Sequence, residues 1–324
     1  MQLALKEMPE VLGRPIELVV VDNKSDKVEA ANAVKRLVER DKVVALIGTY
    51  GSSLAMAGAE VAEKAKVPGV GTSCTSPLVT QGKKYYFRAC FIDPYQGEKM
   101  ATYASEKLGA KTAAVFYQTG NDYSEGLMNA FVEKAKALGI EIVDSEAFAE
   151  GDKDFKAQMT NIAKSAPDVV FSPNYYEDDG KIVTQARQLG YEGTFLGGDG
   201  WDGLEGYASN DQLKDTYFCA NYAKGSNSEF EDAYKAEYGE EYPNGFSPLG
   251  YDAAKTVVYG LQAAEDAGLE AGTDDYKQAV IDAIASGTID GITGTFTFDE
   301  HHDPVKQTAI LTYVDGKPVL KEMF

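Results

Sequence analysis

Residues 43–80, VVALIGTYGSSLAMAGAEVAEKAKVPGVGTSCTSPLVT, decide the fold class of this chain. The apolar, β-rich run 43–47 is followed by small and hydroxyl-bearing residues. A helical stretch at 55–65 and a short strand at Gly69–Gly71 come next. Apolar strands separated by helical crossovers are typical of parallel sheets that are buried on both faces. We therefore expect an α/β fold.

The same alternation of strand and helix continues along the chain and predicts two doubly wound parallel-sheet lobes. The segment 87–96, FRACFIDPYQ, divides two similar series of strands and helices, and the tail from Gly291 is typical of consecutive strands with turns. The expected strands are 16–21, 43–47, 113–117, 141–143, 168–172 and 194–196, and the expected helices are 28–40, 125–138, 155–165 and 180–189.

Extra strands late in the chain indicate that it crosses between the lobes more than once. We expect residues 1–92 and 223–297 to form lobe 1, residues 93–222 and 298–324 to form lobe 2, and a ligand cleft to lie between them. The chain opens with an amphipathic helical pattern, MQLALKEMPEVLG, before its first β-rich run. Since a doubly wound lobe normally opens with a strand, we expect that the first strand of lobe 1 is missing from this sequence.

Composition excludes several classes of function. The chain of 324 residues carries 51 acidic and 31 basic side chains, a formal net charge of −20, which disfavours nucleic acid as a partner. Its three cysteines (Cys74, Cys90 and Cys219) form no CxxC pair, and its two histidines are adjacent. A phosphate-binding P-loop, a dinucleotide fingerprint in its usual place and a nucleophile elbow are all absent. These absences leave carboxylate chemistry as the one route to an enzyme, and Asp199 and Asp202 are the only close carboxylate pair at a glycine-rich loop. We expect no catalytic residues, no metal and no cofactor.

Two loops at the carboxyl ends of expected strands carry the first candidate site. Ligands of open α/β sheets bind at such loops, where helices begin. The loop 48–53 reads GTYGSS and the loop 72–77 reads TSCTSP. Hydroxyls and the N–H groups of a helix start favour an anion such as a carboxylate. The same residue types also form helix N-caps and turns, an alternative that stays open for each serine or threonine alone. The candidates are Ser52, Ser73 and Thr75, with Tyr50, Ser53 and Cys74 as further possible wall residues.

Three later loops carry a second set of candidates. Tyr123 precedes a helix, Tyr175 follows the strand 168–172, and Asp199 stands between glycines after the strand 194–196. Tyrosine has an apolar face and a polar tip, which suits a cleft wall, and the carboxylate of Asp199 could accept hydrogen bonds from an ammonium group. A surface tyrosine and an Asx turn are the alternatives.

These stretches together resemble a known family, the type I periplasmic binding proteins, and within it the branched-chain amino acid (Leu/Ile/Val) binding proteins of ABC transporters. The matching stretches run in family order over nearly the whole chain: residues 43–80, YYFRACFIDPYQG, NDYSEGL, DVVFSPNYYEDDGKIVTQARQLG, FLGGDGW, GYDAA and GTFTFDE. The resemblance implies two lobes joined by a hinge of several crossings. This chain departs from some relatives in having Gly51 where they have a cysteine, and Asp199 where they have a glutamate.

The resemblance also implies roles for the candidate residues. Ser52 would bind the ligand's carboxylate, Thr75 its carboxylate and ammonium groups, and the Ser73 carbonyl its ammonium group. Tyr123 and Tyr175 would line the cleft from the second lobe, Asp199 would pair with the ammonium group, and Trp201 would add a bulky wall.

The function implied is capture of a free amino acid, aliphatic or branched-chain, and its delivery to an ABC permease. The protein would be a monomer outside the cytoplasm, in the periplasm or at the cell surface as a lipoprotein, although no signal segment occurs in this sequence. A ligand-sensing domain of a receptor or regulator with the same fold is the alternative. In either case an amino acid whose two charges contact different lobes would favour the closed state.

Overall fold

The computed structural model describes residues 1–324, and their contacts divide the chain into two compact units. Unit 1 comprises Met1–Ile92 and Gly225–Lys306, and unit 2 comprises Asp93–Lys224 and Gln307–Phe324. The chain therefore passes between the units three times. No helix combines the length and the apolar composition that crossing a bilayer requires.

Residues 298–306 belong to unit 1, whereas the sequence placed them in the second lobe. Their contacts explain the difference. The carboxylate of Asp303 forms an ion pair with Arg88 at 2.7 Å. Lys306, the last residue of unit 1, donates from its buried ammonium group to the Ala89 carbonyl at 2.6 Å and to the Thr293 hydroxyl at 2.7 Å.

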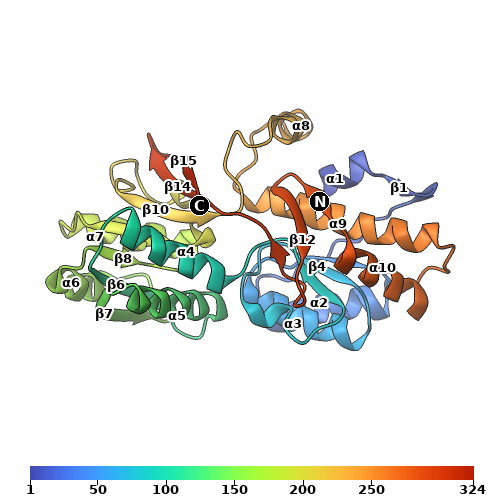
Figure 1. The fold of residues 1–324 in the computed structure, drawn as a ribbon, viewed down its shortest axis with the longest axis horizontal. Helices are drawn as coiled ribbons and strands as arrows, with labels where there is room; N and C mark the ends of the chain where they lie inside the picture. Colours follow the sequence, from blue (N-terminus) through green and yellow to red (C-terminus); the bar gives the residue numbers. More distant parts are fainter. The chain divides into compact units, whose positions relative to one another are not determined.

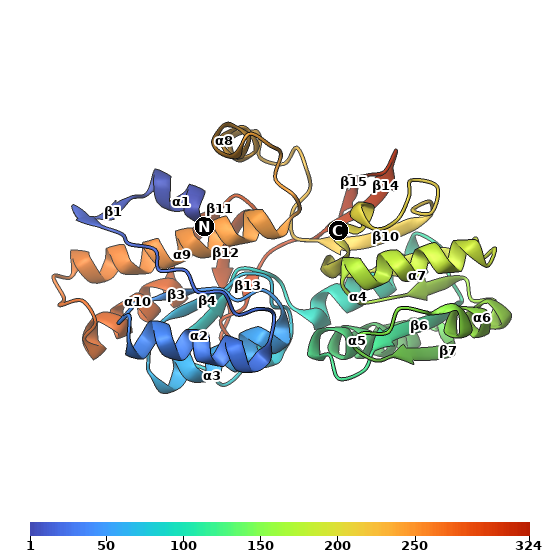
Figure 2. The same cartoon turned by 180° about the vertical axis from the view of Figure 1, so that it is seen from behind.

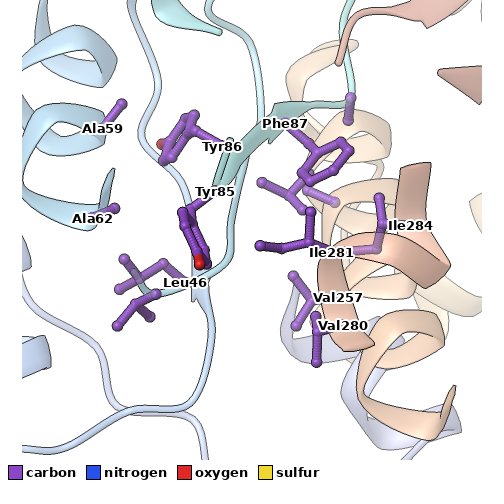
Figure 3. Close-up of a cluster of buried hydrophobic side chains, with 14 of the residues drawn as sticks. Leu46, Ala59, Ala62, Tyr85, Tyr86, Phe87, Val257, Val280, Ile281 and Ile284 are labelled. Carbon is purple, nitrogen blue, oxygen red and sulfur yellow. The ribbon is translucent and has the colours of Figure 1, made fainter. Parts of the chain in front are cut away.

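Unit 1 contains a parallel sheet with helices on both of its faces (Figures 1 and 3). Its strand order is β3-β4-β5, and all neighbours are parallel. Figure 3 shows Tyr85, Tyr86 and Phe87 between Ala59 and Ala62 of α3 on one side and helices α9 and α10 on the other. The elements before the first crossing are α1 (Gln2–Glu7), β1 (Glu10–Val11), β2 (Arg14–Pro15), α2 (Lys27–Glu39), β3 (Leu46–Ile47), α3 (Ser52–Lys64), β4 (Gly69–Gly71), η1 (Pro77–Val79) and β5 (Tyr86–Arg88).

The second part of unit 1 adds helices and a small antiparallel sheet. Its elements are α8 (Ser228–Tyr238), α9 (Phe246–Asp266), α10 (Asp274–Ser286), β11 (Ile289–Gly291), β12 (Gly294–Phe298) and β13 (Pro304–Val305). Strands β11, β12 and β13 pair in that order. Helix α9, the longest of the chain at 21 residues, packs on β4 and on α10.

The N-terminal part of unit 1 differs from the prediction. Only Gln2–Glu7 of the expected opening helix is helical, and β1 and β2 then form a hairpin whose turn residues Leu12 and Gly13 both have positive φ. Residues 16–21, IELVVV, form no strand. A β-branched run favours extended backbone, but a strand also requires a neighbour for its backbone hydrogen bonds. That the first strand of this lobe is missing stays a prediction.

Unit 2 is built on a seven-stranded sheet in the order β15-β14-β10-β9-β8-β6-β7. Strands β10, β9, β8, β6 and β7 are parallel to one another. Strands β14 and β15 add antiparallel pairs at the edge next to β10. The elements are α4 (Asp93–Glu106), β6 (Thr112–Gln118), α5 (Asp122–Ala137), β7 (Glu141–Phe148), α6 (Lys156–Ser165), β8 (Val169–Phe171), α7 (Tyr176–Gln188), β9 (Thr194–Gly197), η2 (Asp199–Trp201), η3 (Leu204–Gly206), β10 (Thr216–Ala220), β14 (Ala309–Val314) and β15 (Lys317–Met323).

This sheet confirms the predicted α/β fold class. Helices α4 and α5 pack against each other, as do α6 and α7 (Figure 2). The last two strands, β14 and β15, form the predicted antiparallel pair, and Asp315 and Gly316 make its turn with positive φ. Phenylalanine side chains from the strands and from the loop before α6 fill the interior of unit 2: Phe116, Phe148, Phe155, Phe195 and Phe218.

Candidate functional site

The two hydroxyl-rich loops of unit 1 lie next to each other because they follow neighbouring parallel strands. Leu46 and Ile47 of β3 pair with Gly69 and Val70 of β4. Beyond the strands, the Gly51 N–H donates to the Ser73 carbonyl at 2.8 Å, and the Thr72 hydroxyl donates to the Thr49 carbonyl at 3.2 Å. The loops 48–53 and 72–77 are thus joined by hydrogen bonds and present their polar groups together.

Ser52 is the first residue of α3 and is 1% exposed. The N-cap position belongs to Gly51, so the alternative that Ser52 caps the helix does not hold. Instead, its hydroxyl oxygen accepts a hydrogen bond from the Ser76 N–H at 3.0 Å. A hydroxyl also has one hydrogen to donate. Ser52 can therefore donate toward an anion while its oxygen position is fixed by the second loop.

The other candidates of unit 1 are also close to this loop pair. Thr75 and Ser73 are buried, at 2% and 6% exposure, and the Ser73 carbonyl accepts the Gly51 N–H. Ser53 is half-buried in the first turn of α3. Tyr50 is exposed and packs edge-on against Phe246, with 5.0 Å between ring centroids.

Arg88 supports the second loop and was missed by reasoning from the sequence. Its guanidinium is fully buried and donates to the carbonyls of Cys74 at 2.6 Å and Ser76 at 2.7 Å. The same group donates to the Thr80 hydroxyl and pairs with the Asp303 carboxylate. A planar group with five donors suits this convergence of acceptors. The available signal was an arginine within the otherwise apolar β5.

In unit 2, Tyr123 and Tyr175 form a stacked pair. Their ring centroids are 4.9 Å apart and their planes are inclined by 25°. Tyr123 is the second residue of α5 and is 2% exposed, and its hydroxyl oxygen accepts the Gly200 N–H at 2.9 Å. This bond connects the start of α5 to the glycine-flanked loop that contains Asp199.

Asp199 is part of a buried polar network with two residues that the sequence did not single out, Gln96 and Asp93. The Gln96 amide donates to Asp93 Oδ1 at 2.9 Å and to Asp199 Oδ1 at 3.2 Å. Its carbonyl oxygen accepts the Asp199 N–H at 3.0 Å. Burial raises the pKa of Tyr123 well above its usual value, and the negative charges of Asp199 and Asp93 raise it further. This part of unit 2 therefore favours a positively charged group.

Trp201 has a different role from the predicted one. It is fully buried in the core of unit 2 and does not form an exposed wall. Its indole N–H donates to the Asp179 carboxylate and to the Ser172 carbonyl, the latter at 2.8 Å. The same carboxylate accepts the Asn174 backbone N–H at 3.0 Å. Asp179, in the first turn of α7, thereby connects the loop before α7 to the loop of Asp199.

Cys74, the remaining possible wall residue, is also buried, at 1% exposure. Its backbone carbonyl and N–H are both engaged, by Arg88 and by Cys90. No group of three or more His, Cys, Asp or Glu side chains is arranged to hold a metal ion.

Comparisons with known proteins identify the family of this chain. The family model described as periplasmic binding protein matches residues 1–318. The Leu/Ile/Val/Thr/Ala-binding protein of Pseudomonas aeruginosa is 29% identical over 300 residues, which are 90% of this chain and 77% of that protein. A Leu/Ile/Val-binding protein homolog of Brucella melitensis is 27% identical, over 95% of this chain and 83% of its own length.

Solved structures are also similar to this chain. The leucine-binding protein of Thermotoga maritima is 36% identical and superposes with a TM-score of 0.91, covering 99% of this chain and 91% of that one. The branched-chain amino acid transporter substrate-binding protein of Streptococcus pneumoniae, solved with isoleucine, is 32% identical with a TM-score of 0.89, over 99% and 91% of the two chains. The resemblance inferred from the sequence is confirmed: this chain belongs to the periplasmic binding protein family and is similar throughout to its branched-chain amino acid members.

Proposed function

We propose that this chain binds a free amino acid with an aliphatic or branched side chain and delivers it to an ABC permease. One observation carries the proposal: unit 1 joins two hydroxyl-rich loops at the start of α3, whereas unit 2 buries the carboxylates of Asp199 and Asp93 around one amide. The names of the relatives supply the chemical class, because they bind leucine, isoleucine and valine. The family is one of solute-binding proteins that act outside the cytoplasm.

The carboxylate of the amino acid would bind to unit 1. Helix α3 is 13 residues long, and the N–H groups of its first turn have no partner within the helix. These groups and the helix dipole favour an anion. The hydroxyls of Ser52 and Thr75 would add donors without introducing a counter-ion. The Ser73 carbonyl would accept from the ammonium group of the same ligand.

The ammonium group would bind mainly to Asp199 in unit 2. The Gln96 amide donates to the Asp199 carboxylate and orients it. The same amide donates to Asp93, whose carboxylate adds a second negative charge. A hydrogen bond to a charged group contributes about 1.5–3 kcal/mol. Because each unit would contact a different pole of the ligand, the amino acid would stabilise the closed state, which the permease would recognise. We expect the protein to act as a monomer, free in the periplasm or held at the cell surface as a lipoprotein.

Calorimetry with two truncated ligands tests the proposal. We expect leucine to bind, and its oxo acid, which lacks the ammonium group, and its amide, which lacks the carboxylate, to bind at least tenfold more weakly. Asp199→Ala should weaken leucine binding well over tenfold but should weaken binding of the oxo acid little. Asp211→Ala removes an exposed carboxylate from the same unit and serves as the control.

Two results would refute the proposal. One is an unchanged leucine dissociation constant in Asp199→Ala. The other is a thermal-shift screen in which none of the twenty amino acids stabilises the protein, since a ligand at 100 times its dissociation constant adds about 2.7 kcal/mol.

A further inference from the structure

Two of the three cysteines lie at the same end of neighbouring strands in unit 1. Cys74 is three residues beyond β4, and Cys90 is two residues beyond β5. Strands β4 and β5 are parallel with Gly71 opposite Arg88, and the Ala89 N–H donates to the Gly71 carbonyl at 2.9 Å. Neighbouring strands are about 4.8 Å apart, which is within the range of Cα separations that a disulfide spans.

The side chains of these two cysteines face each other. The Cys74 N–H donates to Cys90 Sγ at 3.1 Å. A Cβ atom placed on Gly71 would lie 2.4 Å from Cys74 Sγ, so this sulfur is turned back over the strand that pairs with β5. Burial raises the pKa of the Cys90 thiol, and the neighbouring Cys74 raises it further. Cys219 lies apart from both, since it belongs to β10 of unit 2.

We propose that Cys74 and Cys90 form an intramolecular disulfide when the protein folds in an oxidising compartment. The oxidant is a disulfide RS–SR, small or protein-borne. One cysteine thiolate attacks it and releases RSH, and the second cysteine then displaces the other RS group from the mixed disulfide. Two cysteine thiols are oxidised, one disulfide RS–SR is reduced to two RSH, and the atoms balance. The location outside the cytoplasm that the family implies is one in which such bonds form and persist.

The surroundings of the thiols determine when this reaction occurs. Both side chains are almost fully buried, at 1% and 0% exposure. Burial and a raised pKa both slow the reaction of a thiol with an external disulfide. We therefore expect the bond to form during folding and to form slowly in the folded, reduced protein. Once formed, it closes the loop 74–90, which contains Thr75 and Arg88, and it stabilises the protein by restricting the unfolded chain.

The test is a count of free thiols in the full chain. Protein refolded in a buffer of oxidised and reduced glutathione is denatured and alkylated, and its intact mass is measured. We expect one adduct, at Cys219, and three adducts after reduction. Trypsin cleaves after Lys66, Lys83, Arg88 and Lys99, so the oxidised sample should contain residues 67–83 linked to residues 89–99.

Variants separate this pair from any other. Under oxidising conditions Cys219→Ser should give no adduct, whereas Cys74→Ser and Cys90→Ser should each give two. Reduction should lower the melting temperature of the wild type and of Cys219→Ser by several degrees and leave that of Cys90→Ser unchanged. Three adducts in refolded wild type, or a linked peptide that contains Cys219, would overturn the proposal. The peptide map uses the wild type, so it decides the matter even if a variant fails to fold. The amino acid plays no part in this readout, which is therefore independent of the proposed function.

Discussion

Asp179 provides the sharpest test of how the loop of Asp199 is held, because its carboxylate is fully buried beneath that loop. The carboxylate accepts hydrogen bonds from Trp201 and Asn174 and is bonded to the Ser172 hydroxyl. Burial nevertheless dominates and raises the pKa of Asp179 from 3.8 to about 7. The folded protein therefore holds a proton at this position over a pH range in which the unfolded chain does not.

The sign and size of the effect on stability follow from this difference. A carboxyl group whose pKa is raised by folding stabilises the folded state below its unfolded pKa, and this contribution is lost as the pH rises through the folded value. A rise of about three pKa units corresponds to about 4 kcal/mol in total. Roughly 2.5 kcal/mol of that falls between about pH 5 and about pH 8.

Urea unfolding of the wild type and of Asp179→Asn at several pH values measures this contribution. The amide does not titrate, so the free energy of unfolding of the wild type, minus that of the variant, should fall by about 2.5 kcal/mol over this pH range. The difference removes the contributions of all other titrating groups. Asp211→Asn, at an exposed position in the same unit, is the control substitution. Parallel stability curves for the wild type and Asp179→Asn would refute the assignment of a raised pKa to Asp179.

Three further predictions address the loops and the unit boundary. Arg88→Met should lower the free energy of unfolding in urea by about 3–5 kcal/mol, because it leaves the buried Asp303 carboxylate and two carbonyls without their donor. Arg40→Met, at an exposed position, should change the free energy of unfolding little. Gly200→Ala would place a Cβ 2.6 Å from a backbone carbonyl and should weaken amino acid binding at least tenfold in calorimetry; Gly206→Ala, with no atom within 4 Å of its Cβ, should leave it unchanged. Burial lowers the pKa of Lys306 to about 8, so above that pH the unfolded chain binds more protons than the folded one. The free energy of unfolding of the wild type, minus that of Lys306→Met, should therefore rise by up to about 3 kcal/mol toward pH 10.

The parts of the fold that the sequence predicted are those in which local pattern and tertiary environment agree. The strands at Thr112–Gln118 and Thr194–Gly197 are apolar because both faces of the sheet are covered, so their pattern alone identifies them. Residues 16–21 have the same composition but form no strand, since pairing depends on a neighbour and not on the run itself.

The candidate site divides in the same way. That the loops of Ser52 and Thr75 lie together was predictable, because loops that follow adjacent parallel strands meet at one edge of the sheet. Gln96 and Asp179 were not, because their importance comes from side chains that fold against them from distant parts of the sequence: Gln96 bonds to Asp199, 103 residues away, and Asp179 to Trp201, 22 residues away. A single sequence contains no measure of those contacts.

Hydrogen bonds from neighbouring residues fix the candidate ligand groups in place. Ser52 Oγ is held by the Ser76 N–H, the Tyr123 hydroxyl by the Gly200 N–H, and the Asp199 carboxylate by the Gln96 amide, in each case within one unit. Groups that are already oriented lose little conformational entropy when a ligand binds, so more of each hydrogen bond contributes to affinity. These hydrogen bonds form when the protein folds, before any amino acid binds, and they offset the free-energy cost of burying the polar groups. A substitution that removes one of these donors should therefore weaken amino acid binding, although the substituted residue does not contact the ligand. The same substitution should lower the stability of the unit that contains it.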